Sequence, residues 1–417
     1  MTAPGWPEMT RIFGRIGLLS FGGPAAQIAL MHKELVEERP WLSEQSYLRA
    51  LSLCMLLPGP EAMQLATYAG WRLRGVAGGV LAGLLFVVPG ALVIALLALG
   101  YAYLGQLPLV QAAFAGIKAA VIVVVFQALR KVAGKALAGW QGWALAGLSF
   151  VALFFFGLPF PLIILAAGIW GMLTGAGPQT APPLGDVATT PGHSLRTLAI
   201  WGGLWVAPLL MLWGLGQDFL LQLGLFFSKL AVVTFGGAYA VLAYMTQTVV
   251  QDYGWITTAQ MIDALGLAET TPGPLILVTE FVALLAGFAQ AGIAGAIAAG
   301  LVALWVTFTP CFLWIFLAGP YLERISAQPR LSGALQAITA AVVGVIANLS
   351  IWFALHVLFT DVQPARFLAV PAPTLSSFDA IAAALTCAAA VLMLALRRGF
   401  VQTMAILAVV ATIAGLL

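Results

Sequence analysis

Apolar runs of helical length recur along the whole chain, and they restrict its fold more than any other feature. Hydrophobic residues make up 62% of the 417 residues and charged residues 8%, whereas a soluble domain carries about 25% charged residues. Because no water-soluble fold of this length can bury so much apolar side chain, we expect many membrane spans. A transmembrane barrel would show weaker, alternating segments of about ten residues. The sequence therefore predicts an all-α polytopic protein in the lipid bilayer.

A second constraint is an internal repeat. The motif Phe-Gly-Gly begins at Phe21 and again at Phe235, 214 residues later, and a Pro-Gly-Pro motif and a tryptophan recur at the same offset. Farther on, "GVAGGVLAG" from Gly75 matches "GIAGAIAAG" from Gly292 at an offset of 217, which a small insertion explains. We predict a tandem duplication with four parts: an N-terminal repeat (1–135), intervening spans with a polar linker (136–223), a C-terminal repeat (224–358) and closing spans (359–417).

The two copies carry opposite charge patterns in matching loops. Between Gly23 and Gly75 the first copy holds five basic residues, and the matching stretch of the second copy holds none. The next loop reverses the pattern, because the second copy has Arg324 and Arg330 there and the first copy is uncharged. Since Lys and Arg mark the cytoplasmic side of a membrane protein, we predict that the copies are inverted in the membrane, with the N-terminus inside.

Glycine and proline interrupt the expected helices twice in each copy. Gly-Gly cannot easily sustain a helix and Pro24 is suited to start one, so residues 11–20 and 24–39 are expected as separate arms. Around Pro58-Gly59-Pro60, residues 47–57 and 61–72 are each too short to cross a core of about 30 Å. This pattern predicts a re-entrant hairpin, with two steeply tilted spans as the alternative. Inverted repeats with broken helices are characteristic of secondary transporters, although channels and some membrane enzymes also use repeats.

The helix breaks also predict an anion site. A helix that begins at mid-membrane presents unpaired N–H groups and a partial positive charge, which an anion can satisfy. Lys118 lies inside the apolar stretch "AGIKAAVIVV", where a charge is expensive and usually functional. Close helix packing at Gly-Gly and snorkelling of Arg15 and Lys229 are the structural alternatives. The predicted substrate-binding residues are Arg15, Ser20, Gly22, Gly23, Gly59, Lys118, Lys229, Thr234, Gly236, Gly237, Thr271 and Gly273.

Acidic residues near the Pro-Gly-Pro motifs are candidates for ion coupling. Glu61 follows the first motif, Glu269 precedes the second and Glu280 lies beyond it. A carboxylate near the midplane could carry a proton, although Glu61 could equally cap its helix. The sequence contains no spacing typical of a metal, haem, flavin or nucleotide site, so we expect no cofactor and no enzymatic activity. A net charge of +3 gives no reason to expect nucleic-acid binding.

Several of these motifs resemble the chromate ion transporter family. The resemblance lies in "SFGGP", "LLPGPEAMQLATYAGW" and "GGVLAGLLFVVPG" in the first copy and in "TFGGAYAVL" and "TTPGPL" in the second. It covers nearly the whole chain and implies the long, two-domain form of the family. Members are bacterial and archaeal inner-membrane proteins that export chromate, with the membrane potential or the proton gradient implicated. One departure is that Ala238, not proline, follows the second Phe-Gly-Gly.

The resemblance implies a tetrahedral oxyanion as substrate. Chromate and sulfate share charge and shape, so transport of sulfate or another oxyanion is an alternative to chromate export. A passive anion channel is an alternative of a different class, and a chromate reductase would need a redox cofactor site that the sequence lacks. A homodimer is one assembly that the sequence allows.

Overall fold

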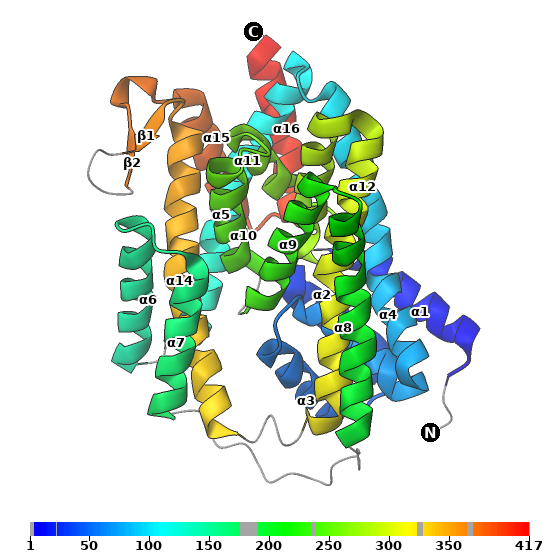
Figure 1. The fold of residues 1–417 in the computed structure, drawn as a ribbon. Helices are drawn as coiled ribbons and strands as arrows, with labels where there is room; N and C mark the ends of the chain where they lie inside the picture. Colours follow the sequence, from blue (N-terminus) through cyan, green and yellow to red (C-terminus); the bar gives the residue numbers. More distant parts are fainter. Residues whose placement is uncertain are drawn as a thin grey trace. The chain divides into compact units, whose positions relative to one another are not determined.

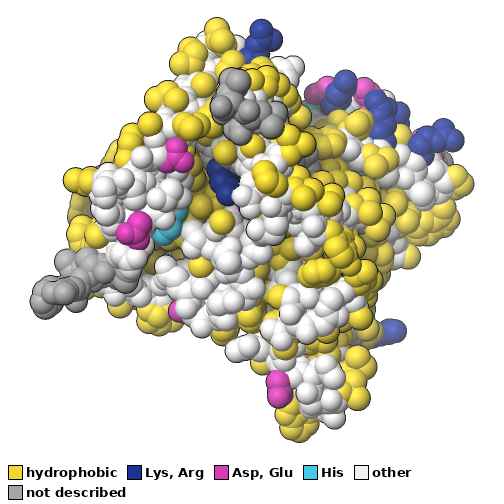
Figure 2. All heavy atoms as spheres, turned by 90° about the horizontal axis from the view of Figure 1, so that it is seen from above, with side chains coloured by type: hydrophobic (Ala, Val, Ile, Leu, Met, Phe, Trp, Pro, Cys, Tyr) yellow, Lys and Arg dark blue, Asp and Glu magenta, His cyan; other side chains and the backbone are white. Residues whose placement is uncertain are grey.

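The computed structural model describes residues 4–21, 23–137, 139–175, 191–235, 238–322, 328–364 and 370–416. These residues are almost wholly α-helical (Figure 1), apart from a small antiparallel pair of strands, β1 (Val362–Pro364) and β2 (Pro371–Pro373). Hydrophobic side chains cover much of the visible surface, and Lys and Arg gather in a few places (Figure 2). The helices that are long and apolar enough to cross a membrane are Glu61–Leu104, Pro108–Ala136, Gly192–Gly214, Leu275–Tyr321 and Pro329–Leu358. The predicted all-α polytopic architecture is confirmed.

The chain folds into two compact units that do not follow the order of the sequence. The first unit comprises Met1–Leu99, Gly175–Ala238 and Thr271–Gly333, and the second comprises Gly100–Thr174, Tyr239–Thr270 and Ala334–Leu417. Each unit therefore takes segments from both predicted repeats. Both predicted Pro-Gly-Pro tips and both Phe-Gly-Gly segments belong to the first unit.

The first unit begins with short helices that are interrupted at the predicted places. Helix α1 (Trp6–Leu19) ends before Ser20, and α2 (Gly23–His32) begins at Gly23, whose φ of +78° favours glycine. Helix α2 continues into the π-helical turn Lys33–Glu37, and α3 (Glu44–Leu56) follows. In the second copy, α9 (Asp218–Val233) corresponds to α1, and α10 (Ala238–Gln247) leads into a matching π-helical turn, Thr248–Asp252.

Helices α4 (Glu61–Leu104) and α12 (Val278–Ala318) each fold back on themselves. The backbone leaves the helical region at Gly75 in α4 and at Gly292 in α12, where φ is +62° and +57°. A Cβ atom on Gly70 would overlap the carbonyl oxygen of Gly78, whereas eight residues of a straight helix span about 12 Å. The arm before each bend is therefore short and antiparallel to the long arm after it. These bends lie beyond the Pro-Gly-Pro motifs and join other arms than those of the predicted hairpin (47–57 and 61–72), so the re-entrant hairpin stays a prediction.

The residue at which α12 begins explains why the offset between the two repeats changes along the chain. A 3₁₀ turn, Leu275–Leu277, stands between the second Pro-Gly-Pro motif and the first residue of α12, Val278. In the first copy α4 begins at Glu61, directly after the motif. The three residues of this turn account for the change of offset from 214 to 217.

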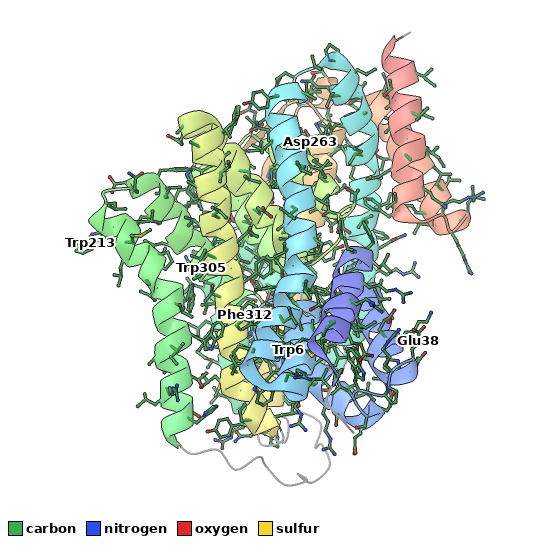
Figure 3. The ribbon with its side chains drawn as sticks, turned by 90° about the vertical axis from the view of Figure 1, so that its right-hand side faces the viewer. Trp6, Glu38, Trp213, Asp263, Trp305 and Phe312 are labelled. Carbon is green, nitrogen blue, oxygen red and sulfur yellow. The ribbon has the colours of Figure 1, made fainter. Side chains whose placement is uncertain are left out.

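Helix α8 (Pro191–Gly214) packs along α12 in the first unit (Figure 3). The ring of Trp201 stacks on Phe312 with centroids 5.4 Å apart, and the indole N–H of Trp305 donates to the carbonyl oxygen of Leu204 at 2.8 Å. These aromatic contacts connect the helix that precedes the second copy to the long arm of α12.

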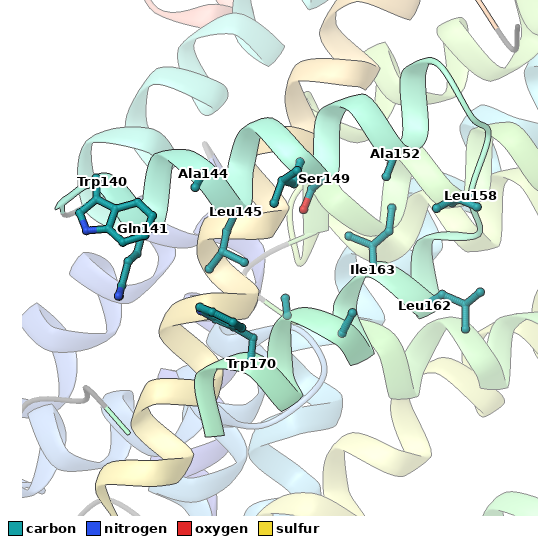
Figure 4. Close-up of a pocket in the computed structure, with 13 residues that line it drawn as sticks. Trp140, Gln141, Ala144, Leu145, Ser149, Ala152, Leu158, Leu162, Ile163 and Trp170 are labelled. Atoms are coloured by element: carbon teal, nitrogen blue, oxygen red, sulfur yellow. The ribbon is translucent and has the colours of Figure 1, made fainter. Parts of the chain in front are cut away.

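The second unit is centred on α5 (Pro108–Ala136), which packs against α15 (Ala380–Ala390) and α16 (Phe400–Leu416). A Cβ atom on Gly116 would overlap the backbone of Leu407, so α5 and α16 approach closely. Helices α6 (Gly139–Phe154) and α7 (Phe160–Thr174) form a hairpin with an apolar groove of about 560 Å³ between them (Figure 4). The same unit contains α11 (Thr258–Ala268) and most of α14 (Pro329–Leu358).

Candidate functional site

Two reciprocal hydrogen bonds join the copies inside the first unit. The N–H of Gly59 donates to the carbonyl oxygen of Thr234 at 2.9 Å, and the N–H of Gly273 donates to the carbonyl oxygen of Ser20 at 3.0 Å. Ser20 and Thr234 correspond in the repeat, as do Gly59 and Gly273. Each hairpin tip therefore contacts the broken helix of the other copy, which is the contact pattern of a pseudo-two-fold pair. The fold brings together four of the predicted site residues.

The Pro-Gly-Pro sequence explains why these bonds form at the tips. Proline has no N–H, so the central glycine supplies the donor of each motif. The φ angles of Gly59 and Gly273 are +120° and +88°, which favour glycine. Space is also limited, because a Cβ atom on Gly59 would lie 3.0 Å from the Sγ atom of Cys311 and one on Gly90 would overlap the carbonyl oxygen of Pro272. The tips are therefore tightly packed against α12 and α4.

Helices begin at each described break, as the sequence predicts. Helix α2 starts at Gly23 and α10 at Ala238, and neither has an acidic residue in its first turn. Helices α4 and α12 each carry one, Glu61 and Glu280. Since a carboxylate near a helix N-terminus partly satisfies its positive potential, α2 and α10 have the helix starts more favourable to an added anion. Gly22, Gly236 and Gly237, which precede these starts, lie outside the described residues.

The predicted hydroxyl groups bind the backbone of their own helices. The hydroxyl of Ser20 donates to the carbonyl oxygen of Ile16 and that of Thr234 to Leu230, each at 2.6 Å. Both side chains are buried. Because a hydroxyl has one hydrogen to donate, these groups stabilise the helix ends in this conformation. Thr271 is also buried in the same unit.

The predicted basic residues differ in their surroundings. Arg15 lies 3.3 Å from the carboxylate of Glu34, which also accepts a 2.6 Å bond from Arg39. The Glu34 side chain is 2% exposed, so two arginines share one buried carboxylate. The second copy has Thr248 in place of Glu34. Lys229, the counterpart of Arg15, is exposed on α9.

Sequence reasoning missed two buried glutamines beside the tips. The amide nitrogen of Gln27 donates to the carbonyl oxygen of Gly273 at 2.7 Å and to that of Ser20 at 3.2 Å. Gln64 donates to the carbonyl oxygen of Pro58 at 2.7 Å. Among the described residues, neither amide oxygen has a hydrogen-bond partner. The sequence feature that could have identified Gln27 is an amide side chain within an apolar helix. It occurs in the first copy only, because Val241 occupies the corresponding position in the second copy.

The candidate coupling acids fall in both units. In the first unit, Glu280 is 3% exposed and its Oε2 atom has no hydrogen-bond partner in the described part of the chain, and Glu61 is half-buried. In the second unit, Glu269 accepts a 2.6 Å bond from the hydroxyl of Tyr239. Lys118 also belongs to the second unit, where its Nζ atom lies 3.2 Å from Asp263. No group of three His, Cys, Asp or Glu side chains is placed to hold a metal ion within the described ranges.

Comparison with known proteins agrees with the arrangement of two copies. A family model described as chromate transporter matches residues 7–172 and 221–416, which include most of both predicted repeats. The chain belongs to the chromate transporter family. A probable chromate transport protein of Synechococcus elongatus is 32% identical over 345 residues, or 82% of this chain and 82% of the relative.

Two further members of the chromate transporter family have the same identity. Chromate transport proteins of Cupriavidus metallidurans and Pseudomonas aeruginosa are each 32% identical, over 352 and 349 residues. These alignments cover 83% and 82% of this chain and 82% and 79% of the relatives. No solved structure matches the chain.

These matches confirm the resemblance found in the sequence and its extent over both halves. Because the named relatives are transport proteins, they indicate a transporter rather than an enzyme. The family and the long apolar helices indicate a multi-pass bacterial membrane protein.

Proposed function

We propose that the protein is a secondary active transporter that exports chromate across the inner membrane, driven by the membrane potential or the proton gradient. The reciprocal bonds Gly59–Thr234 and Gly273–Ser20 are the observation that carries this proposal. They bring two helix ends and two hairpin tips, one of each from each copy, into one unit. Transporters with inverted repeats place their substrate site at such a meeting of broken helices.

The anion would bind near the membrane midplane at the helix starts beside these bonds. The start of α2, in the same unit as these bonds, supplies backbone N–H groups without an acidic residue in the first turn. Arg15 and Lys229 would add positive charge from the two copies. In the transport cycle, rocking of the repeats would expose the site to either side in turn, and a buried carboxylate would carry any coupling proton.

Chromate is the proposed substrate because the relatives are named for it. Backbone N–H groups at a helix start bind phosphate and sulfate as readily as other anions, so sulfate is the second candidate. This alternative keeps the same site and changes only the ion.

Uptake of labelled chromate by everted membrane vesicles tests the proposal. We expect respiration-dependent uptake above that of vesicles without the protein, reduced by excess sulfate. Uptake that is equal with and without respiration, and that persists after the ion gradient is collapsed, would indicate a passive channel. No uptake by vesicles in which the inserted protein is detected would contradict chromate export.

A matched pair of glycine variants tests the site. Gly273→Leu changes a tip, whereas Gly147→Leu changes a glycine of α6 with open space around it. We expect the first to abolish uptake and the second to retain it at equal protein levels. Normal uptake by a well-inserted Gly273→Leu variant would contradict the proposed site.

A further inference from the structure

A cluster of three polar side chains lies inside the second unit, apart from the hairpin tips. Asp263 on α11, labelled in Figure 3, is 4% exposed. Its Oδ2 atom accepts a 2.7 Å hydrogen bond from the hydroxyl of Tyr101, and its Oδ1 atom lies 3.2 Å from the Nζ atom of Lys118. The Lys118 side chain is 25% exposed, whereas the Asp263 side chain is 5% exposed.

The fold common to both repeats does not require this ion pair. Arg49 stands in the first copy where Asp263 stands in the second, and Thr339 stands in the second copy where Lys118 stands in the first. A buried ion pair is costly to desolvate and is weak evidence for stability. Ionisable residues in membrane segments are rare and usually functional. A pair found once in a duplicated framework is therefore better explained by function than by packing.

The Oδ1 atom of the carboxylate, which pairs with Lys118, is the oxygen that can take up a proton. Tyr101 already donates to Oδ2, whereas Oδ1 faces the ammonium but accepts no aligned hydrogen bond from a described residue. The charged and titratable groups that face Asp263 are Tyr101 from the end of α4 and Lys118 from α5. Helix α11 carries no other charged residue, and Glu269, which follows it, accepts a bond from Tyr239. A proton on Oδ1 would cancel the carboxylate charge and leave the ammonium without its counter-ion.

We propose that Lys118 and Asp263 form a charge-exchange site, in which protonation of Asp263 releases Lys118 to bind the transported oxyanion. One proton adds to Oδ1, no other bond is made or broken, and the proton leaves when the anion departs and the ion pair re-forms. This inference rests on the proposed oxyanion transport. Because the proton and the anion are bound together, the proton would travel with the anion, and the membrane potential rather than the proton gradient would then drive export of the complex, which keeps a net negative charge. Anion binding and proton binding at the site then favour each other by the same factor.

The test measures labelled chromate binding and proton uptake together on the purified full chain, in weak buffer with a pH indicator. For the wild type we expect the affinity for chromate to rise about tenfold as the pH falls. We also expect about one proton to be taken up for each anion bound. Asp263→Asn mimics the protonated carboxyl group, so it should bind chromate without proton uptake and without this pH dependence. Lys118→Met should lose about tenfold or more in affinity. Since chromate speciation is the same for every variant, differences between variants report the protein.

Controls separate this inference from the proposed function and from misfolding. Lys135→Met replaces an exposed lysine on the same helix and should match the wild type. The double variant Lys118→Met/Asp263→Asn contains no unpaired charge, so it should remain folded and bind as weakly as Lys118→Met. Two results would overturn the charge-exchange site. One is that Asp263→Asn binds chromate as the wild type does and takes up the same number of protons. The other is that the folded double variant keeps the full affinity for chromate. No chromate binding or transport by the wild type would instead refute the proposed function.

Discussion

The hydrogen bonds of Gln27 give a quantitative prediction about the contact between the copies. Its amide nitrogen donates to Gly273 at 2.7 Å and to Ser20 at 3.2 Å, and so links the tip of one copy to the broken helix of the other. Gln27→Met keeps nearly the same side-chain volume and removes the donor. Each buried hydrogen bond contributes about 1 kcal/mol, so the positioned tip should lose about 2 kcal/mol. At 1.4 kcal/mol for each factor of ten, this loss corresponds to an about 30-fold smaller equilibrium constant for the positioned state, which is the upper limit of the fall in its population.

The assay is the initial rate of respiration-dependent chromate uptake by everted vesicles, normalised to the amount of inserted protein. We expect Gln27→Met to lower this rate by up to about 30-fold. Gln222→Met replaces an exposed glutamine on α9 of the same unit, and it should leave the rate unchanged. A rate for Gln27→Met within about twofold of the wild type, less than 0.5 kcal/mol, would refute the argument that this amide positions the tip.

Further predictions concern packing, charge and pH. Gly90→Ala places a methyl group against the carbonyl of Pro272, and thermal unfolding should show a loss of about 1–3 kcal/mol; an unchanged melting temperature would contradict the close approach. Arg15→Ala should abolish chromate uptake without preventing insertion, and full uptake by a well-expressed Arg15→Ala/Lys229→Ala variant would end the idea that these charges serve the site. The hydrogen bond to Glu44 raises the pKa of His32, outside the five long spans. Its stabilisation is therefore fully present below the unfolded-state pKa of about 6.5 and is lost as pH rises through the higher folded value. Unfolding measured against pH should show this loss in the wild type and not in His32→Gln, and equal profiles would contradict it.

The sequence was sufficient to predict the helix breaks at Gly23 and at the Pro-Gly-Pro motifs, but not the bends at Gly75 and Gly292. Gly23 and the Pro-Gly-Pro motifs act locally, through backbone angles and a missing donor, so their effect is visible without knowing the fold. The repeat offset alone also pairs Ser20 with Thr234 and Gly59 with Gly273, the residues that form the two reciprocal hydrogen bonds.

The pairings themselves depend on tertiary contacts between distant segments. Gln27 and Gly273 are 246 positions apart, and helical periodicity contains no information about which carbonyl an amide will reach. Asp263 was not singled out because no local pattern joins it to Lys118 and Tyr101. The interleaving of the two repeats in each compact unit is likewise a property of packing.

Disulfide trapping of one hairpin tip tests the central claim most directly. A Cβ atom at position 59 would lie 3.0 Å from Sγ of Cys311, close enough for a disulfide to form without large backbone movement. The variant Gly59→Cys is prepared with Cys54→Ala and Cys387→Ser, and its insertion is checked first under reducing conditions, because the backbone of Gly59 favours glycine. We predict that oxidation will cross-link the tip of the first copy to α12 of the second, that reductant will reverse the cross-link, and that added Cys311→Ser will prevent it. A well-inserted variant that forms no cross-link would contradict the account.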